Sequence, residues 1–296
     1  MRAVVIPTPL TPTLSRKRER GFSAAAVSNY EPRAVRSSVV DDRKACFLKS
    51  AVGEAAPSGD AGAFIEHGVG TRLLRDVGGR ARCLRDVSVH FARFRVTEIS
   101  LGAAANHQFS RDGMLHAAEL LGDARVDAIC WNGTSASWLG FDRDRELCRA
   151  IEAATGVAAT SSVLAMAEWL RGAGIERVGL VSPYIDRVQQ QIGETLAGEG
   201  LEVVGERHLG LSENFAFGEV APRQIEDMIR ATAMAAPQAI LVMCTNLRAA
   251  PLVEALEREL GAPILDSVAS AVWGSLRIAG VDPSGVTGWG RLFDMP

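Results

Sequence analysis

Cys244 is the residue of this chain whose position best suits chemistry. It ends the apolar run Ala239–Met243, which predicts a strand buried on both faces, and it precedes a helical pattern over 250–260. A thiol at the point where a parallel strand passes into a helix lies near unpaired backbone N–H groups, which favour a thiolate or bind an anion. Most free cysteines are instead small buried apolar side chains, and this interpretation stays open at this point.

Two more polar loops follow predicted strands, at residues 132–137 (Asn-Gly-Thr-Ser-Ala-Ser) and at Pro183-Tyr184. Gly133 lets the backbone approach a ligand closely, and hydroxyl and amide N–H groups together suit a carboxylate. Serine and threonine at such turns are also typical of helix caps. Because ligands of open parallel sheets bind beyond the carboxyl ends of the strands, we expect these loops and Cys244 to line one site.

The elements that position these loops alternate regularly from about residue 86 onward. The βαβ pattern predicts mainly parallel sheets with right-handed crossovers, arranged as two α/β lobes of similar size. The predicted strands are 87–94, 126–131, 177–182, 201–207, 239–243 and 263–265, and the predicted helices are 111–121, 142–154, 162–173, 185–197, 222–235, 251–260 and 267–278.

The N-terminal part of the chain has a different composition. Residues 1–62 combine a proline- and threonine-rich stretch, a basic cluster and small residues without sustained periodicity, so they are predicted to be disordered or a non-native extension. The first α/β lobe is assigned to 63–170, with no first strand recognisable before Val87. The second lobe is assigned to 171–296, with a C-terminal segment that returns to the first lobe.

Composition excludes several classes of protein. The 296 residues are 47% hydrophobic with a formal net charge of -3, which gives no reason to expect nucleic acid or an anionic membrane as partner. Five cysteines without paired spacing, and five histidines without helical spacing, predict neither a disulfide framework nor a metal site and favour a reducing cytoplasm. The chain lacks an apolar run long enough to span a membrane, phosphate-binding glycine motifs and a serine-hydrolase G-x-S-x-G sequence.

The polar loops, taken in order, resemble the aspartate/glutamate racemase superfamily, and within it the branch of arylmalonate decarboxylase, maleate cis-trans isomerase and ectoine-utilisation proteins. The resemblance implies two pseudo-symmetric lobes, each a mainly parallel sheet flanked by helices, with the active site in the cleft between them. It also implies a small carboxylic acid as substrate and neither cofactor nor metal. The stretches that carry it are 132–138, 181–186, 243–246 and 288–294.

The resemblance also assigns roles to residues. Racemases of the superfamily place one cysteine on each side of the substrate, whereas here Gly133 occupies the first cysteine position and Cys244 remains. This pattern resembles arylmalonate decarboxylase, and it implies that a disubstituted (aryl)malonate loses carbon dioxide and that the enediolate is protonated by Cys244, since a thiol of ordinary pKa is mostly protonated at neutral pH. The implied oxyanion and substrate-binding residues are Gly133, Thr134, Ser135, Tyr184, Asn214, Thr245 and Asn246.

Three alternatives stay open. Asn214 resembles a substrate-binding asparagine of maleate isomerase, and Thr245-Asn246 stands where arylmalonate decarboxylase is glycine-rich. Both features point to a smaller dicarboxylate and to cis-trans isomerisation or racemisation. In a two-cysteine enzyme Cys130 would be the partner thiol, although its place inside a predicted strand favours packing. The alternative from another class is a non-catalytic carboxylate-binding protein, because two α/β lobes also suit a sensor.

Overall fold

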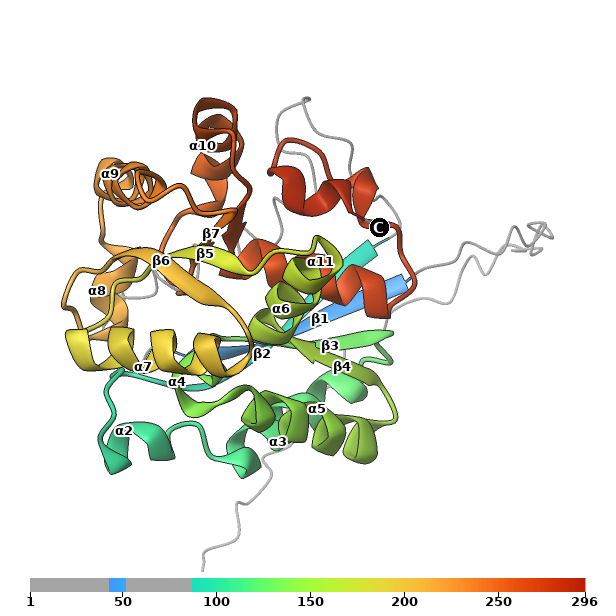
Figure 1. Cartoon of the computed structure of the whole chain (residues 1–296). Helices are drawn as coiled ribbons and strands as arrows, with labels where there is room; N and C mark the ends of the chain where they lie inside the picture. The colour runs from blue at the N-terminus through green and yellow to red at the C-terminus, as the bar shows by residue number, and fades with distance from the viewer. Residues whose placement is uncertain (1–42, 52–86, 296) are drawn as a thin grey trace, which may run out of the picture. The chain divides into compact units, whose positions relative to one another are not determined.

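Two parallel sheets form the framework of the computed structural model, which describes residues 43–51 and 87–295. Within these residues each sheet has four strands, in the order β2-β1-β3-β4 for the first and β6-β5-β7-β8 for the second (Figure 1). The second order repeats the first, strand for strand. The predicted α/β fold with two pseudo-symmetric lobes is therefore confirmed.

The element bounds follow the predicted alternation closely. The strands are β1 (Arg43–Ala51), β2 (Val87–Arg95), β3 (Ala128–Asn132), β4 (Ala158–Ser161), β5 (Arg177–Val181), β6 (Glu202–Arg207), β7 (Ala239–Val242) and β8 (Ile264–Asp266). The α-helices are α2 (Ala103–His107), α3 (Arg111–Gly122), α4 (Ala136–Leu139), α5 (Phe141–Thr155), α6 (Ser162–Gly172), α7 (Asp186–Gly198), α8 (Asn214–Gly218), α9 (Pro222–Ala233), α10 (Val253–Leu260) and α11 (Ser267–Ile278). Short 3₁₀ helices are η1 (Ala250–Leu252), η2 (Pro283–Gly285) and η3 (Arg291–Asp294).

Strand β1 corrects the prediction for the N-terminal region. It lies in the middle of the first sheet and pairs in parallel with both β2 and β3. The strand falls inside the predicted extension 1–62, and it was missed because charged residues at 43–44 and 49 leave only four uninterrupted apolar residues between them. The other residues of that predicted extension, and residues 63–86, lie outside the described residues.

Local sequence explains where the helices begin and end. The Asp266 side chain accepts hydrogen bonds from the backbone N–H groups of Val268 and Ala269 and so caps α11, and Ser161 caps α6 in the same way. Helix α5 ends at Gly156, whose φ of 71° is a left-handed conformation that glycine adopts without strain. Both capped helices follow the edge strand β4 or β8 of their sheet directly.

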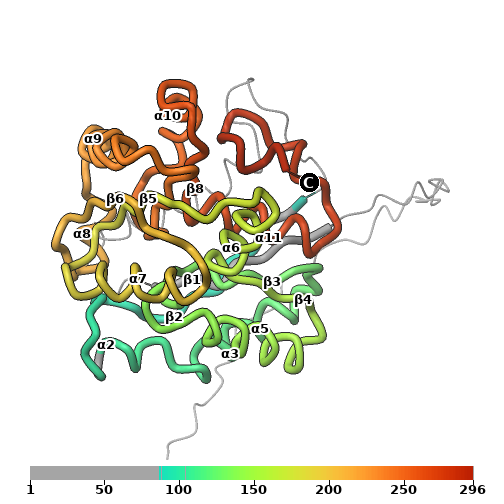
Figure 2. Tube along the Cα trace, viewed as in Figure 1, coloured from blue at the N-terminus to red at the C-terminus, as the bar shows by residue number. Residues whose placement is uncertain are grey.

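Helix α11 connects the two lobes. It follows β8 of the second sheet, but it packs against α6 and against strands β3 and β4 of the first sheet. The C-terminal segment, red in Figure 2, also returns to these helices. There the indole of Trp169 donates to the carbonyl of Leu292 at 3.0 Å, and the indole of Trp273 donates to the carbonyl of Met295 at 2.9 Å.

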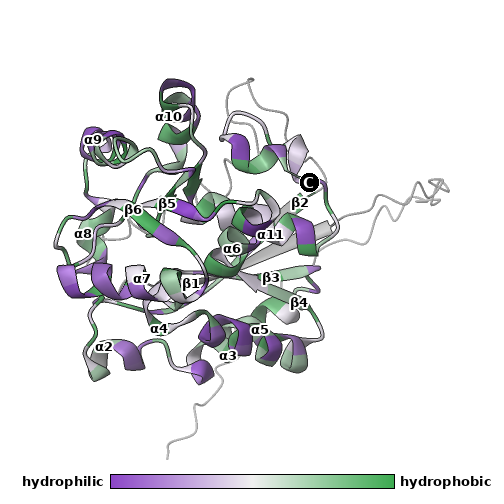
Figure 3. Ribbon diagram, in the orientation of Figure 1, coloured by the Kyte–Doolittle hydropathy of each residue, from purple (hydrophilic) through white to green (hydrophobic). Residues whose placement is uncertain are grey.

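The core lies along the strands and between the lobes. One cluster of buried apolar residues combines side chains of both lobes, and a smaller cluster lies between the first sheet and helices α3 and α5. In Figure 3 hydrophilic purple covers parts of α5, α7 and α9. Among the helices of the described residues, none has the length and apolar character needed to cross a membrane.

Candidate functional site

The loops after β3 and β5 meet through two buried hydroxyl groups. Thr134 Oγ1 and the Tyr184 hydroxyl share a hydrogen bond of 2.8 Å, and both side chains are buried. Thr134 belongs to the first lobe and Tyr184 to the second, so this bond joins the lobes at the carboxyl ends of their strands. The structure thus brings together two of the residues that the sequence predicts for the site.

Tyr184 is itself held by a chain of polar contacts. Its backbone N–H donates to Ser182 Oγ at 3.2 Å, and the Ser182 hydroxyl donates to Gln189 Oε1 at 2.6 Å. Gln189 in turn donates to Glu206 Oε2 at 2.7 Å, which also contacts His208. Burial lowers the pKa of His208, but its hydrogen bonds to Glu206 and Asp186 outweigh that effect and raise it. These contacts extend from the loop after β5 to the end of β6.

A second hydrogen-bonded group surrounds the loop after β7. Asn246 Nδ2 donates to Asn214 Oδ1 at 2.6 Å, and Asn214 Nδ2 donates to the carbonyl of Val96 at 3.1 Å. Both asparagine side chains are buried. Asn214 also donates its backbone N–H to the carbonyl of Thr97 at 3.0 Å, which ties the start of α8 to the segment that follows β2. Two predicted substrate-binding residues therefore lie in direct contact with each other.

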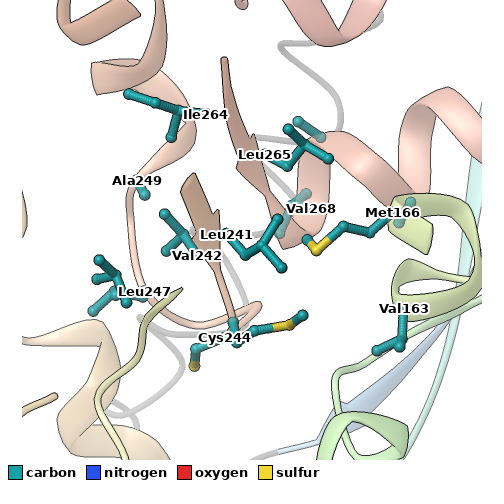
Figure 4. Packing of buried hydrophobic residues seen from close by; sticks show 14 of the residues in the cluster. Val163, Met166, Leu241, Val242, Cys244, Leu247, Ala249, Ile264, Leu265 and Val268 are labelled. Carbon is teal, nitrogen blue, oxygen red and sulfur yellow. The ribbon is translucent and has the colours of Figure 1, made fainter. Parts of the chain in front are cut away.

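Cys244 lies at the end of β7, as Figure 4 shows, among the apolar side chains of the second sheet. Its side chain is 3% exposed. Thr245 is buried directly beside it in the chain, before the hydrogen-bonded Asn246. Cys244 therefore shares one short loop with two other residues that the sequence predicts for the site.

The internal repeat relates Cys244 to Gly133. Trp131 of β3 pairs with the residue that caps α6, and Val242 of β7 pairs with the residue that caps α11. Gly133 and Cys244 each stand two residues beyond these paired positions. They are therefore equivalent positions in the two lobes, and only the second carries a thiol.

Aromatic rings line the contact between the lobes. The Tyr184 ring lies edge-on between Trp138 of α4 and Phe217 of α8, with ring centroids 5.3 Å away on each side. Phe109 packs edge-on against Trp138 at 5.9 Å and against Trp131 at 6.4 Å. Sequence reasoning identified Trp138 and Tyr184 within recognised stretches, but it missed the row of rings because its members are widely separated in sequence.

Two other predicted residues have different surroundings. Ser135 begins α4 and lines a surface depression together with Phe109, Arg143 and Asp144. Cys130, the candidate for a second thiol, lies fully buried inside β3, where burial raises the pKa of its thiol and Ser275 of α11 is a hydrogen-bond partner. Its position is that of a core residue. Among the described residues, no group of three or more histidine, cysteine and acidic side chains is arranged to hold a metal ion.

Comparisons with known proteins agree with this geometry. The family model for arylmalonate decarboxylase matches residues 90–293. The chain is 34% identical over 165 residues to arylmalonate decarboxylase from Bordetella bronchiseptica, covering 55% of this chain and 69% of that protein. It is 31% identical over 133 residues to maleate isomerase from Nocardia farcinica, covering 45% of this chain and about half, 53%, of that protein.

A solved structure shows the same fold. It is a liganded double variant of arylmalonate decarboxylase, in which a glycine is replaced by cysteine and a cysteine by serine. It superimposes with a TM-score of 0.70 at 23% identity, over 86% of this chain and 100% of that chain. The match covers both lobes.

Proposed function

Because the chain belongs to the arylmalonate decarboxylase family, and is thus an enzyme of the lyase or isomerase type, we propose that it decarboxylates a disubstituted malonate with Cys244 as the proton donor. The observation that carries the proposal is the unequal pair of repeat-related positions, Cys244 in the second lobe and Gly133 in the first. A reaction that removes carbon dioxide and then adds one proton needs a single acid, whereas racemisation needs an acid and a base on opposite faces.

In the proposed reaction the bond between the α-carbon and the departing carboxylate breaks. Its electron pair passes to the retained carboxylate, which becomes an enediolate, and carbon dioxide leaves. The Cys244 thiol then gives its proton to the α-carbon, and the thiolate takes a proton from solvent. Thr134, Ser135, Tyr184 and the backbone N–H groups near Cys244 and Thr245 are the proposed donors to the enediolate oxygens, where hydrogen bonds strengthen as charge develops.

The aromatic row supports a substrate with an apolar substituent. The rings of Trp138, Tyr184 and Phe217 pack against one another and make the surroundings of Tyr184, a proposed oxyanion donor, apolar; such surroundings suit an aryl or alkyl group better than a charged one. An apolar surface also disfavours a departing carboxylate relative to neutral carbon dioxide.

A maleate isomerase or a racemase of small dicarboxylates is the second candidate. The buried amide pair of Asn214 and Asn246 favours it, because Asn246 follows Cys244 in the same loop and bonds to Asn214, and such polar groups suit a second carboxylate better than an aryl ring. The maleate isomerase relative agrees with this alternative.

The test is carbon dioxide release from a panel of substituted malonates that includes an aryl one, with maleate and aspartate turnover measured on the same preparation. Cys244→Ser should abolish release while the fold and ligand binding persist. Cys148→Ser is the matched control, since Cys148 is a buried cysteine on α5 and should leave turnover unchanged. Turnover of maleate or aspartate alone would move the assignment to the second candidate, and binding without turnover of any acid would refute both.

A further inference from the structure

Gly133 faces a steric constraint that its counterpart Cys244 does not share. A Cβ atom added at Gly133 would overlap Cζ2 of the Trp131 indole and would lie 2.5 Å from Cε2 and Cη2. Real Cβ atoms essentially never approach another heavy atom that closely. The φ of Gly133 is not positive, so the need for glycine comes from this lack of space and not from the backbone angle.

The indole has little freedom to move aside. Trp131 is 1% exposed and belongs to the buried cluster between the first sheet and helices α3 and α5. Its ring packs against Phe94 at 5.2 Å and against Phe109 at 6.4 Å between centroids. Displacing it would open a cavity at one point and create overlaps at another, and both changes are costly in a closely packed core.

We propose that Trp131 is a specificity-determining residue, because its indole prevents a second thiol from acting on the substrate from position 133. By filling the space beside Gly133, the indole excludes any acid or base from the position that the internal repeat relates to Cys244. The proton then reaches the enediolate only from Cys244, and the product forms as one enantiomer that is not racemised afterwards. This inference rests on the proposed function of Cys244, and it adds that substitution of Gly133 alone does not create a racemase here.

The steric part of the proposal is tested without any substrate. Gly133→Ala should lower the melting temperature by several degrees in the wild-type background, because the added Cβ overlaps the indole. In a Trp131→Leu background, which keeps an apolar side chain but removes the ring, the same change should cost much less. Equal costs in the two backgrounds would overturn the proposal, since the conflict would then lie elsewhere.

The chemical part is tested with exchange of the α-hydrogen of each product enantiomer in deuterated water, followed by NMR. Gly133→Cys alone should exchange no faster than the wild type, and Gly133→Cys combined with Trp131→Leu should exchange and racemise the product. The controls are Trp131→Leu alone and the combination with Cys244→Ser, neither of which should racemise.

These measurements separate the two claims. Racemisation by Gly133→Cys with Trp131 intact would refute the role of Trp131. Failure of the folded double variant to exchange, while wild-type decarboxylation depends on Cys244, would also refute it and would leave the proposed function standing. Absence of Cys244-dependent turnover in the wild type would instead refute the proposed function, and the melting experiments would still decide the steric conflict.

Discussion

The hydrogen bond between Thr134 and Tyr184 makes a quantitative prediction about how the lobes are joined. Tyr184→Phe keeps the ring and its edge-on contacts with Trp138 and Phe217, but it removes the hydroxyl that Thr134 Oγ1 contacts at 2.8 Å. A buried polar atom that loses its partner costs about 1–3 kcal/mol, so this variant should lose about that much unfolding free energy. Thr134→Val should lose a similar amount.

The double variant decides whether the two losses come from one interaction. With both hydroxyls gone, neither side chain keeps a hydroxyl that has lost the other one, so the combined loss should fall short of the sum by about 1 kcal/mol. Urea unfolding of the four proteins, followed by circular dichroism, measures this coupling. Additive losses, within about 0.5 kcal/mol, would refute the conclusion that the hydroxyls stabilise one another across the lobes.

The same variants connect the bond to the proposed reaction. Loss of one oxyanion donor typically lowers the rate by about 10²–10³, so Tyr184→Phe should fall in kcat by that order. Thr232→Val is the matched control, because Thr232 is a buried threonine of α9 that donates to the carbonyl of Met228 at 2.9 Å. It should lose stability but keep kcat, and an equal loss of rate in both variants would argue against the donor role of Tyr184.

Three further predictions concern stability. Burial raises the pKa of Asp144 to about 7, so the folded state holds this proton more tightly than the unfolded state, and the free energy of unfolding falls as pH rises from about 4 to 7. In urea unfolding, Asp144→Asn should be as stable as the wild type below pH 4 and more stable at neutral pH, by up to about 4 kcal/mol. Gly179→Ala should lower the free energy of unfolding by about 1–3 kcal/mol, because its Cβ would lie 2.5 Å from Thr232 Cγ2. Gly193→Ala on α7 meets no atom within 4 Å and should stabilise the protein, so equal melting temperatures for the two variants would contradict the packing. Glu257→Ala should leave the backbone N–H groups of Ile264 and Arg291 without their hydrogen-bond acceptor, which should lower the free energy of unfolding by roughly 1–3 kcal/mol for each group. The amide of Arg291 should then exchange its hydrogen faster than in the wild type.

The sequence predicted most of the regular elements because their periodicity is strong. The helix at 267–278 was predicted with its observed bounds, and the fully buried strand β7 was recognised from its unbroken apolar run. Strand β4 was missed because Ala158–Ser161 consists of small residues and short hydroxyl side chains without a β-forming pattern. Without β1 and β4 the first sheet had only two recognisable strands, so the repeated strand order was not visible in the sequence.

The candidate site was predictable as a set of loops but not as a set of contacts. Strand-end position identified Gly133, Tyr184 and Cys244, because parallel strands place their carboxyl ends at one edge. Side-chain partners depend on packing between segments far apart in the chain, so nothing local indicated that Asn246 would bond to Asn214. The overlap between Trp131 and a Cβ at Gly133 likewise depends on a rotamer that only the packed core determines.

The position of α11 has a consequence for how the chain folds. A helix encoded after the last strand of the second sheet covers strands β3 and β4 of the first, and the larger buried cluster combines side chains of both lobes, so neither half contains its own complete core. Unfolding should therefore occur as one transition, without a stable half-molecule. A chain cut in the turn at residues 173–176 should give fragments that are unfolded apart and that recover the native structure when mixed, since each fragment supplies a surface that the other lacks.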